Sequence, residues 1–138
     1  MPAGPSIIGG ATFLAIKFLG YRYAGVKLNA AYAEIPPVPP NLFGAIRAGL
    51  GLIVGVGFAV TAMQWNVSHA EILWFVLLLP VRLLEWSLVI WIFYERKLGR
   101  VNHARFTRCV MVGSLWSFIL DLPATLSMIV VPGGMWIC

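Results

Sequence analysis

Long apolar runs separated by short polar stretches dominate the chain and predict its elements. Four such segments lie at about residues 6–23, 42–63, 72–94 and 109–131. A helix needs roughly 20 apolar residues to cross the hydrocarbon layer of a bilayer, and each segment is close to that length. The pattern predicts an all-α, integral membrane four-helix bundle that forms one transmembrane domain over residues 1–138.

The first segment and the connection after it contain the main interruptions of this pattern. Lys17 lies within the first segment, and we expect its side chain to extend toward the nearer membrane surface; the alternative is a helix that lies in the interface plane. Residues 24–33 are expected to continue out of the bilayer as an amphipathic stretch. The proline-rich run 36–40 then predicts a stiff, extended connector, and Asn41 is the expected N-cap of the second helix.

The composition supports a membrane protein. Apolar residues make up 60% of the chain and charged residues 11%, whereas a soluble domain carries about 25% charged residues to keep its surface wetted. The net charge of +5 could indicate nucleic acid binding. Because the basic residues flank apolar segments, we attribute it instead to membrane topology and contact with anionic headgroups.

The distribution of basic residues predicts an orientation. Lys17, Arg22, Lys27 and Arg47 border the first connection, and the second connection, residues 64–71, has no Lys or Arg. By the positive-inside rule, connections 1 and 3 are cytoplasmic and both termini are on the non-cytoplasmic side. The basic residues of the third connection are the expected contacts for lipid headgroups: Arg96, Lys97, Arg100, Arg105 and Arg108.

A stripe of small residues runs along the second segment. Its members are spaced four, three, four and four residues apart, which places them on one helical face. Small residues allow close backbone approach between membrane helices, and a Gly-x-x-x-Gly pair is the typical motif. The stripe therefore predicts a face that packs against another helix, either of this chain or of a second chain: Gly44, Ala48, Gly51, Gly55 and Ala59.

Three ionisable residues are predicted near the middle of the bilayer. Arg82 and Glu85 belong to the third segment and Asp121 to the fourth, each ~15–20 Å from the cytoplasmic boundary at the helical rise. A charge at that depth costs at least ~3 kcal/mol. We therefore expect a buried charged cluster in which these groups are paired.

The charge balance of this cluster leaves two alternatives. One arginine cannot neutralise two ionised acids, so either one carboxyl group holds a proton, or Arg47 or Lys17 reaches in from the cytoplasmic side. Pro80 and Pro123 lie two residues from Arg82 and Asp121. They are expected to kink their helices and to free backbone carbonyls, as in some transporter sites.

Other chemistries are not indicated. His69 and His103 lie in connections, so we expect no haem or metal site and no cofactor. Cys109 and Cys138 lie ~40 Å apart along the predicted fourth helix and cannot pair within one chain.

Three hypotheses for function follow. The first is a small subunit or accessory component of a membrane complex, which packs against other membrane protein chains through its small-residue faces. The alternative is an oligomeric proton- or cation-coupled transporter or channel that uses Glu85 or Asp121. The third is an enzyme that modifies lipids, with the basic loop holding headgroups. In each case the lipid bilayer is a partner and nucleic acid is not.

Overall fold

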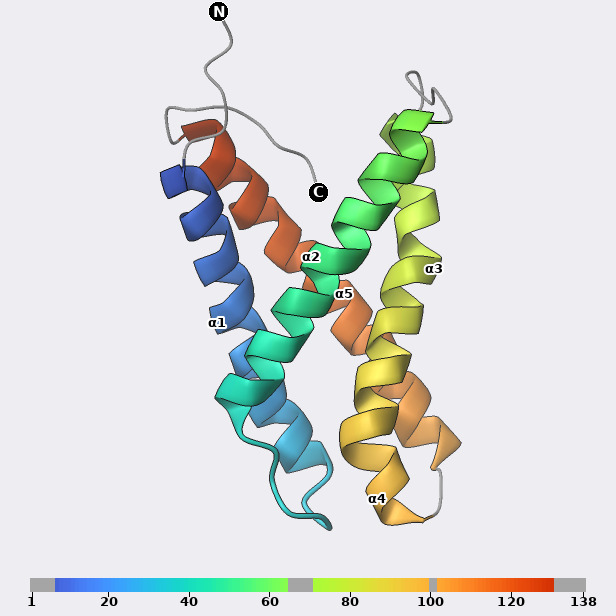
Figure 1. The fold of residues 1–138 in the computed structure, drawn as a ribbon. Coiled ribbons are helices and arrows are strands. Elements are labelled where there is room, and N and C mark those ends of the chain that lie inside the picture. Colours follow the sequence, from blue (N-terminus) through green and yellow to red (C-terminus); the bar gives the residue numbers. More distant parts are fainter. Residues whose placement is uncertain (1–6, 65–70, 100–101, 131–138) are drawn as a thin grey trace, which may run out of the picture.

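Helices make up nearly all of the computed structural model, which describes residues 7–64, 71–99 and 102–130. The third helical path is continuous through α3, the π-helix η1 and α4, so the described residues form four long helical segments without strands (Figure 1). The prediction of an all-α, four-helix chain is confirmed. The elements are α1 Ile7–Ala31, α2 Pro40–Gln64, α3 Glu71–Ile90, η1 Trp91–Glu95, α4 Arg96–Leu98 and α5 His103–Val130.

The helices extend beyond the apolar segments of the sequence. α1 includes most of the amphipathic stretch after residue 23, and α5 begins at His103, one and a half turns before Cys109. Asn102 sets this start, because its side-chain oxygen accepts the backbone N–H of Arg105 at 3.2 Å. The apolar segments of the sequence thus mark only part of the length of these helices.

The connection between α1 and α2 is held by Asn29. Its side-chain amide donates to the carbonyl oxygen of Val38 at 2.8 Å and accepts the Val38 N–H at 3.0 Å. α2 begins at Pro40, so Asn41 lies in the first turn and its predicted role as the N-cap is wrong. Proline suits the first helical position because the N–H it lacks would have no helical partner there.

The third helical path ends with a wide turn and a glycine. In the π-helix η1, Tyr94 and Glu95 are both buried although they are consecutive, and a π-turn is a known way to redirect side chains at functional sites. Gly99 follows with a φ of 66°, the left-handed conformation that glycine adopts without steric cost.

The helices alternate in direction (Figure 1). The first connection and α4 lie at one end of the molecule, which we call the loop end, and α1 begins at the other. α1 packs most extensively against α2 and α5, and α3 packs against α5, whereas α2 and α3 touch little.

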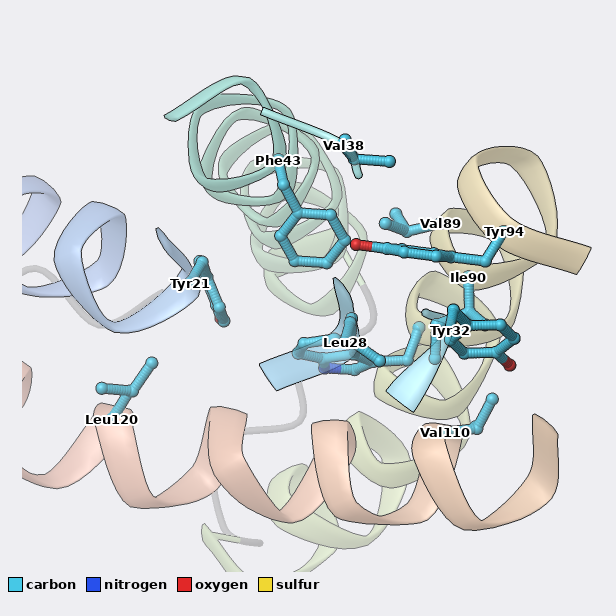
Figure 2. Packing of buried hydrophobic residues seen from close by; sticks show 11 residues of the cluster. Tyr21, Leu28, Tyr32, Val38, Phe43, Val89, Ile90, Tyr94, Val110 and Leu120 are labelled. Carbon is cyan, nitrogen blue, oxygen red and sulfur yellow. The ribbon is translucent and has the colours of Figure 1, made fainter. Parts of the chain in front are cut away.

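The apolar core of the bundle is rich in aromatic side chains (Figure 2). Phe43 of α2 is at its centre, with ring centroids 6.1 Å from Trp86 and 6.3 Å from Tyr94. Aromatic rings at such separations stabilise a core beyond the area they bury. The large core side chains that are at most 1% exposed are Tyr21, Tyr32, Phe43, Trp86, Ile90 and Tyr94.

The small-residue stripe of α2 has two environments. A Cβ on Gly44 would lie 3.0 Å from the Phe18 carbonyl oxygen and 3.1 Å from the Arg22 nitrogen, so α1 and α2 approach closely there. A Cβ on Gly51 would meet the guanidinium groups of Arg47 and Arg82 at 3.4 and 3.6 Å. Ala48 and Gly55 are half-buried, and the side chain of Ala59 lies outside the described residues.

Candidate functional site

Charged side chains from all four long helical segments meet in the interior of the bundle. Arg82 is 7% exposed, Glu85 5%, and the Asp121 side chain 20%, so the structure brings the three predicted residues together. Two further basic residues join them. We call this group the central charge cluster: Lys17 of α1, Arg47 of α2, Arg82 and Glu85 of α3, and Asp121 of α5.

Glu85 joins α2 to α3. One carboxylate oxygen, Oε2, accepts Nη2 of Arg47 at 2.7 Å and Nη1 of Arg82 at 3.2 Å. Arg47 is completely buried. Arg47 therefore donates a charge-assisted hydrogen bond that is shielded from water. Losing one partner of such a bond lowers the stability of the fold more than losing a hydrogen bond at the surface.

Asp121 joins α5 to α1 and α3. The Lys17 ammonium group forms an ion pair with Oδ1 of Asp121, and Nη2 of Arg82 lies 3.5 Å from Oδ2. Arg82 therefore bridges both carboxylates, one on its own helix and one on α5.

The positions of Lys17 and Arg47 correct two expectations from the sequence. Lys17 is 5% exposed, so its predicted extension toward the membrane surface is wrong: the carboxylate of Asp121 faces it across the α1–α5 contact. Both residues lie in the interior rather than bordering the first connection. Of the two alternatives for charge balance, the structure has additional cations reaching in. With three bases and two acids, the cluster needs no protonated carboxyl group for neutrality and has one surplus positive charge.

Aromatic and hydroxyl groups enclose the Arg47 side of the cluster. The Arg47 guanidinium carbon lies 4.8 Å from the Tyr21 ring centroid and 5.0 Å from that of Trp86, within cation–π range. Ser117 of α5 accepts the Trp86 Nε1–H at 2.8 Å and the Tyr21 hydroxyl at 3.3 Å. The sequence gives one signal for Ser117, its place one turn before Asp121 on the same helical face.

The cluster has unused hydrogen-bonding capacity. Among the described residues, four buried side-chain atoms of the cluster have no hydrogen-bond partner: Nε and Nη1 of Arg47, Nε of Arg82 and Oε1 of Glu85. Donors outnumber acceptors, which agrees with the surplus positive charge. Pro80 and Pro123 both lie inside their helices, which continue past them.

A second group of polar side chains lies at the loop end, three of them buried and Asn29 half-buried, and we call it the loop-end polar layer: Asn29, Tyr32, Tyr94 and Glu95. The Tyr32 hydroxyl donates to Oε1 of Glu95 at 2.6 Å, and the Tyr94 hydroxyl donates to Oδ1 of Asn29 at 3.0 Å. Burial raises the pKa of the Tyr32 hydroxyl, and the hydrogen bond to Glu95 raises it further. Nothing in the sequence pattern pointed to this layer.

The described members of the predicted headgroup contacts belong to α4 and to the start of α5, near this end (Figure 1). Arg96, Lys97 and Arg108 are exposed, and Arg100 lies outside the described residues. Arg105 is held by Glu34 at 3.0 Å, and its guanidinium carbon lies 4.6 Å from the centroid of the Tyr32 ring.

Two further observations bear on what this chain can do. Within the described part of the chain, no three His, Cys, Asp or Glu side chains are grouped as metal ligands. By length and composition, one helix of that part could cross a membrane, at Pro40–Gly57, and 17% of this stretch is buried inside the molecule. By itself that is weak evidence for insertion.

No family model matches this chain, and comparison with curated protein sequences and with solved structures finds no significant similarity.

Proposed function

We propose that this chain is a multi-pass membrane protein that serves as a subunit or accessory component of a membrane complex. The observation that carries the proposal is the distribution of its side chains. Charges from all four long helical segments are gathered inside, while large apolar side chains point outward from every one of these segments. Examples with their exposed fractions are Ile8 (69%), Ile53 (72%), Leu84 (72%) and Leu122 (67%).

This distribution suits hydrocarbon rather than water. A soluble protein places its lysines, arginines and acids at the surface and buries residues such as Ile and Leu. In a bilayer the preference is reversed, because lipid-facing Ile and Leu cost nothing and a central charge costs ~3 kcal/mol or more unless protein shelters it. The low burial of Pro40–Gly57 supports the same proposal, since an apolar core helix of a soluble protein would be mostly buried.

The remaining basic residues favour a cytoplasmic loop end. Lys17 and Arg47 lie in the interior and no longer count toward this orientation. The loop end still carries five basic residues, in the last turns of α1, in α4 and at the start of α5: Lys27, Arg96, Lys97, Arg105 and Arg108. By the positive-inside rule, connections 1 and 3 then face the cytoplasm.

The charge balance favours an accessory role over cation or proton transport. Both carboxylates already contact basic groups at hydrogen-bonding or ion-pair distance, and the surplus positive charge opposes binding of a further cation. The same contacts join α1 to α5, α2 to α3 and α3 to α5, so the cluster fixes the register of the bundle. The outward apolar faces are then left for lipid and for neighbouring membrane chains.

Asp121→Asn separates the two roles, because it keeps the size of the side chain and removes its charge. In proteoliposomes we expect the native chain to produce no proton flux when a pH-sensitive dye is enclosed. We expect the variant to unfold at a lower denaturant concentration, because the buried positive charges of Lys17 and Arg82 lose the negative charge of Asp121. Glu34→Gln is the matched control, because Glu34 is a surface carboxylate.

A different outcome would favour the transporter alternative. If the native chain conducts protons, and Asp121→Asn abolishes that flux while unfolding at the same denaturant concentration as Glu34→Gln, Asp121 is a working proton site and the accessory role is wrong.

A further inference from the structure

A groove between α1 and α5 is separate from the central charge cluster. Its volume is about 760 Å³, within the range of cavities that hold small organic ligands. α1 contributes Tyr23, Lys27 and Leu28 to its lining, and α5 contributes the residues on one of its faces between Ala104 and Trp116. The Trp86 ring of α3 also lines the groove, and a Cβ on Gly113 would lie 2.5 Å from that ring, so glycine is what allows the ring to lie there.

The lining of the groove changes from polar to apolar along the helices. At the loop end it contains Asn102, Arg105 and Arg108. Lys27 lies farther from that end, with its ammonium group 5.3 Å from the centroid of the Tyr23 ring. Further along α5 it contains Cys109, Val112, Gly113 and Trp116, and the whole stretch from Asn102 to Trp116 is ~21 Å long at the helical rise. A ligand that matches this lining has an anionic head and an apolar body, with the head at the loop end.

We propose that this groove binds one anionic phospholipid, with its phosphate near Arg108 and an acyl chain over Val112 and Trp116. The exposed Lys27 side chain, whose ammonium group lies over the Tyr23 ring in the empty groove, turns toward the phosphate when the lipid binds. The inference rests on the proposed insertion into a bilayer, which would place the loop end at the headgroup level. Three cations line the groove, with Arg105 and Arg108 at its polar end, and Glu34, an acid paired with them, holds Arg105 at 3.0 Å. Lys27 and Arg108 are both exposed and supply the positive charge that a phosphate requires.

The apolar end argues for a lipid rather than a soluble phosphate. Val112 is 60% exposed, and the Tyr23 and Trp116 rings, 5.7 Å apart, extend the apolar surface beyond the reach of a headgroup alone. A free phosphate would leave this part of the groove uncovered.

The test measures binding of phosphatidylglycerol and of phosphatidylcholine with the same acyl chains to the purified full chain, by native mass spectrometry from mixed micelles. We expect the native chain to prefer phosphatidylglycerol. Lys27→Gln/Arg108→Gln should lose roughly 30-fold in affinity for it, equivalent to about 1 kcal/mol for each basic residue near a phosphate. The matched control is Arg96→Gln/Lys97→Gln, which removes two exposed charges outside the groove and should keep the preference.

A second pair of variants tests the apolar end without changing any charge. Val112→Trp should block the acyl chain and lower phosphatidylglycerol binding, whereas Met111→Trp, at the neighbouring exposed position outside the groove lining, should not. Glycerol 3-phosphate should fail to compete with the lipid. Equal competition by glycerol 3-phosphate, or equal losses in a variant and its control, would overturn the lipid site.

Flotation with phosphatidylglycerol vesicles after alkaline extraction separates this inference from the proposal on which it rests. A chain that floats with the vesicles but shows no preference for phosphatidylglycerol has no lipid site, although it is still a membrane protein. A chain released by alkali contradicts membrane insertion itself.

Discussion

The central charge cluster and the loop-end polar layer each bury a glutamate, but they stabilise it with different partners. Glu85 accepts two arginines on one oxygen, at 2.7 and 3.2 Å. Glu95, which is 2% exposed, accepts the neutral hydroxyl of Tyr32 at 2.6 Å. The first arrangement joins helices through opposite charges, and the second joins Tyr32, in the connection directly after α1, to η1 through a neutral donor.

The difference indicates where the chain depends on charge. At the predicted middle of the bilayer, a carboxylate requires a cation, because neither water nor headgroups can stabilise it. At the loop end a hydroxyl suffices, and the nearby Arg105 pairs with the exposed Glu34. We therefore expect substitutions to lower the free energy of unfolding most in the central charge cluster, less in the loop-end polar layer, and least at the exposed Glu34–Arg105 pair.

The largest effect is expected for Glu85→Gln. The substitution leaves Arg47, which is completely buried, without its charged partner, and breaking a buried pair in this way costs about 3–5 kcal/mol. Unfolding in detergent, followed by circular dichroism, measures the loss. The double variant Arg47→Met/Glu85→Met should recover much of it, because it removes both charges together. A double variant as unstable as the single one would show that the ion pair is not what the fold needs.

The next effect is expected where α1 approaches α2, between the two polar regions. Gly44→Ala would place a Cβ 3.0 Å from a backbone oxygen, which cannot move aside, and such overpacking costs about 1–3 kcal/mol. Gly49→Ala on the same helix is the control, because a Cβ there meets nothing within 4 Å. It should stabilise the chain by about 0.5–1 kcal/mol through helix propensity. Equal effects of the two substitutions on thermal unfolding would argue against this close approach.

Tyr32→Phe tests the loop-end polar layer. It removes the hydroxyl that Glu95 accepts, and an unsatisfied buried polar group costs about 1–3 kcal/mol, so the loss should be smaller than that of Glu85→Gln. Equal losses of stability in Tyr32→Phe and Glu85→Gln would show that the central charge cluster depends on charge no more than the loop-end polar layer does.

The pH dependence of Tyr32 gives a second measurement at this site. Burial raises the pKa of this hydroxyl, so its contribution to stability is complete below the ordinary tyrosine pKa of about 10 and is lost as the pH rises above that value. Stability measured from pH 8 to 11 should therefore fall less steeply in Tyr32→Phe than in the native chain.

The smallest effect is expected at the surface pair. Glu34 is 64% exposed in its side chain, and an ion pair in water contributes no more than about 1 kcal/mol. Glu34→Gln should change the unfolding midpoint little, and added salt should remove the difference. A loss as large as that of Tyr32→Phe would place Glu34 among the buried groups.

The sequence predicted the helices better than the partners of the charged residues. Long apolar runs were enough to locate four helices, and the cost of burying charge was enough to predict that Arg82 pairs with Glu85 and Asp121. The prediction for Lys17 was wrong because a lysine so near the end of an apolar segment is expected to extend toward the membrane surface. In the structure α5 lies beside α1 and places the carboxylate of Asp121 next to Lys17. The Tyr32–Glu95 contact joins residues 63 positions apart, and no local spacing predicts such a pair.

If outward apolar side chains face lipid while the charges lie inside, the surroundings of Ile53 should be hydrocarbon rather than water. A spin label at Ile53→Cys, in a chain whose two native cysteines are replaced by alanine, reports collisions with oxygen and with a water-soluble nickel complex in proteoliposomes. We expect oxygen collisions to dominate at Ile53, which is 72% exposed, and nickel collisions to dominate at a label on Lys97→Cys. Equal nickel accessibility at both positions would place Ile53 in water and contradict membrane insertion.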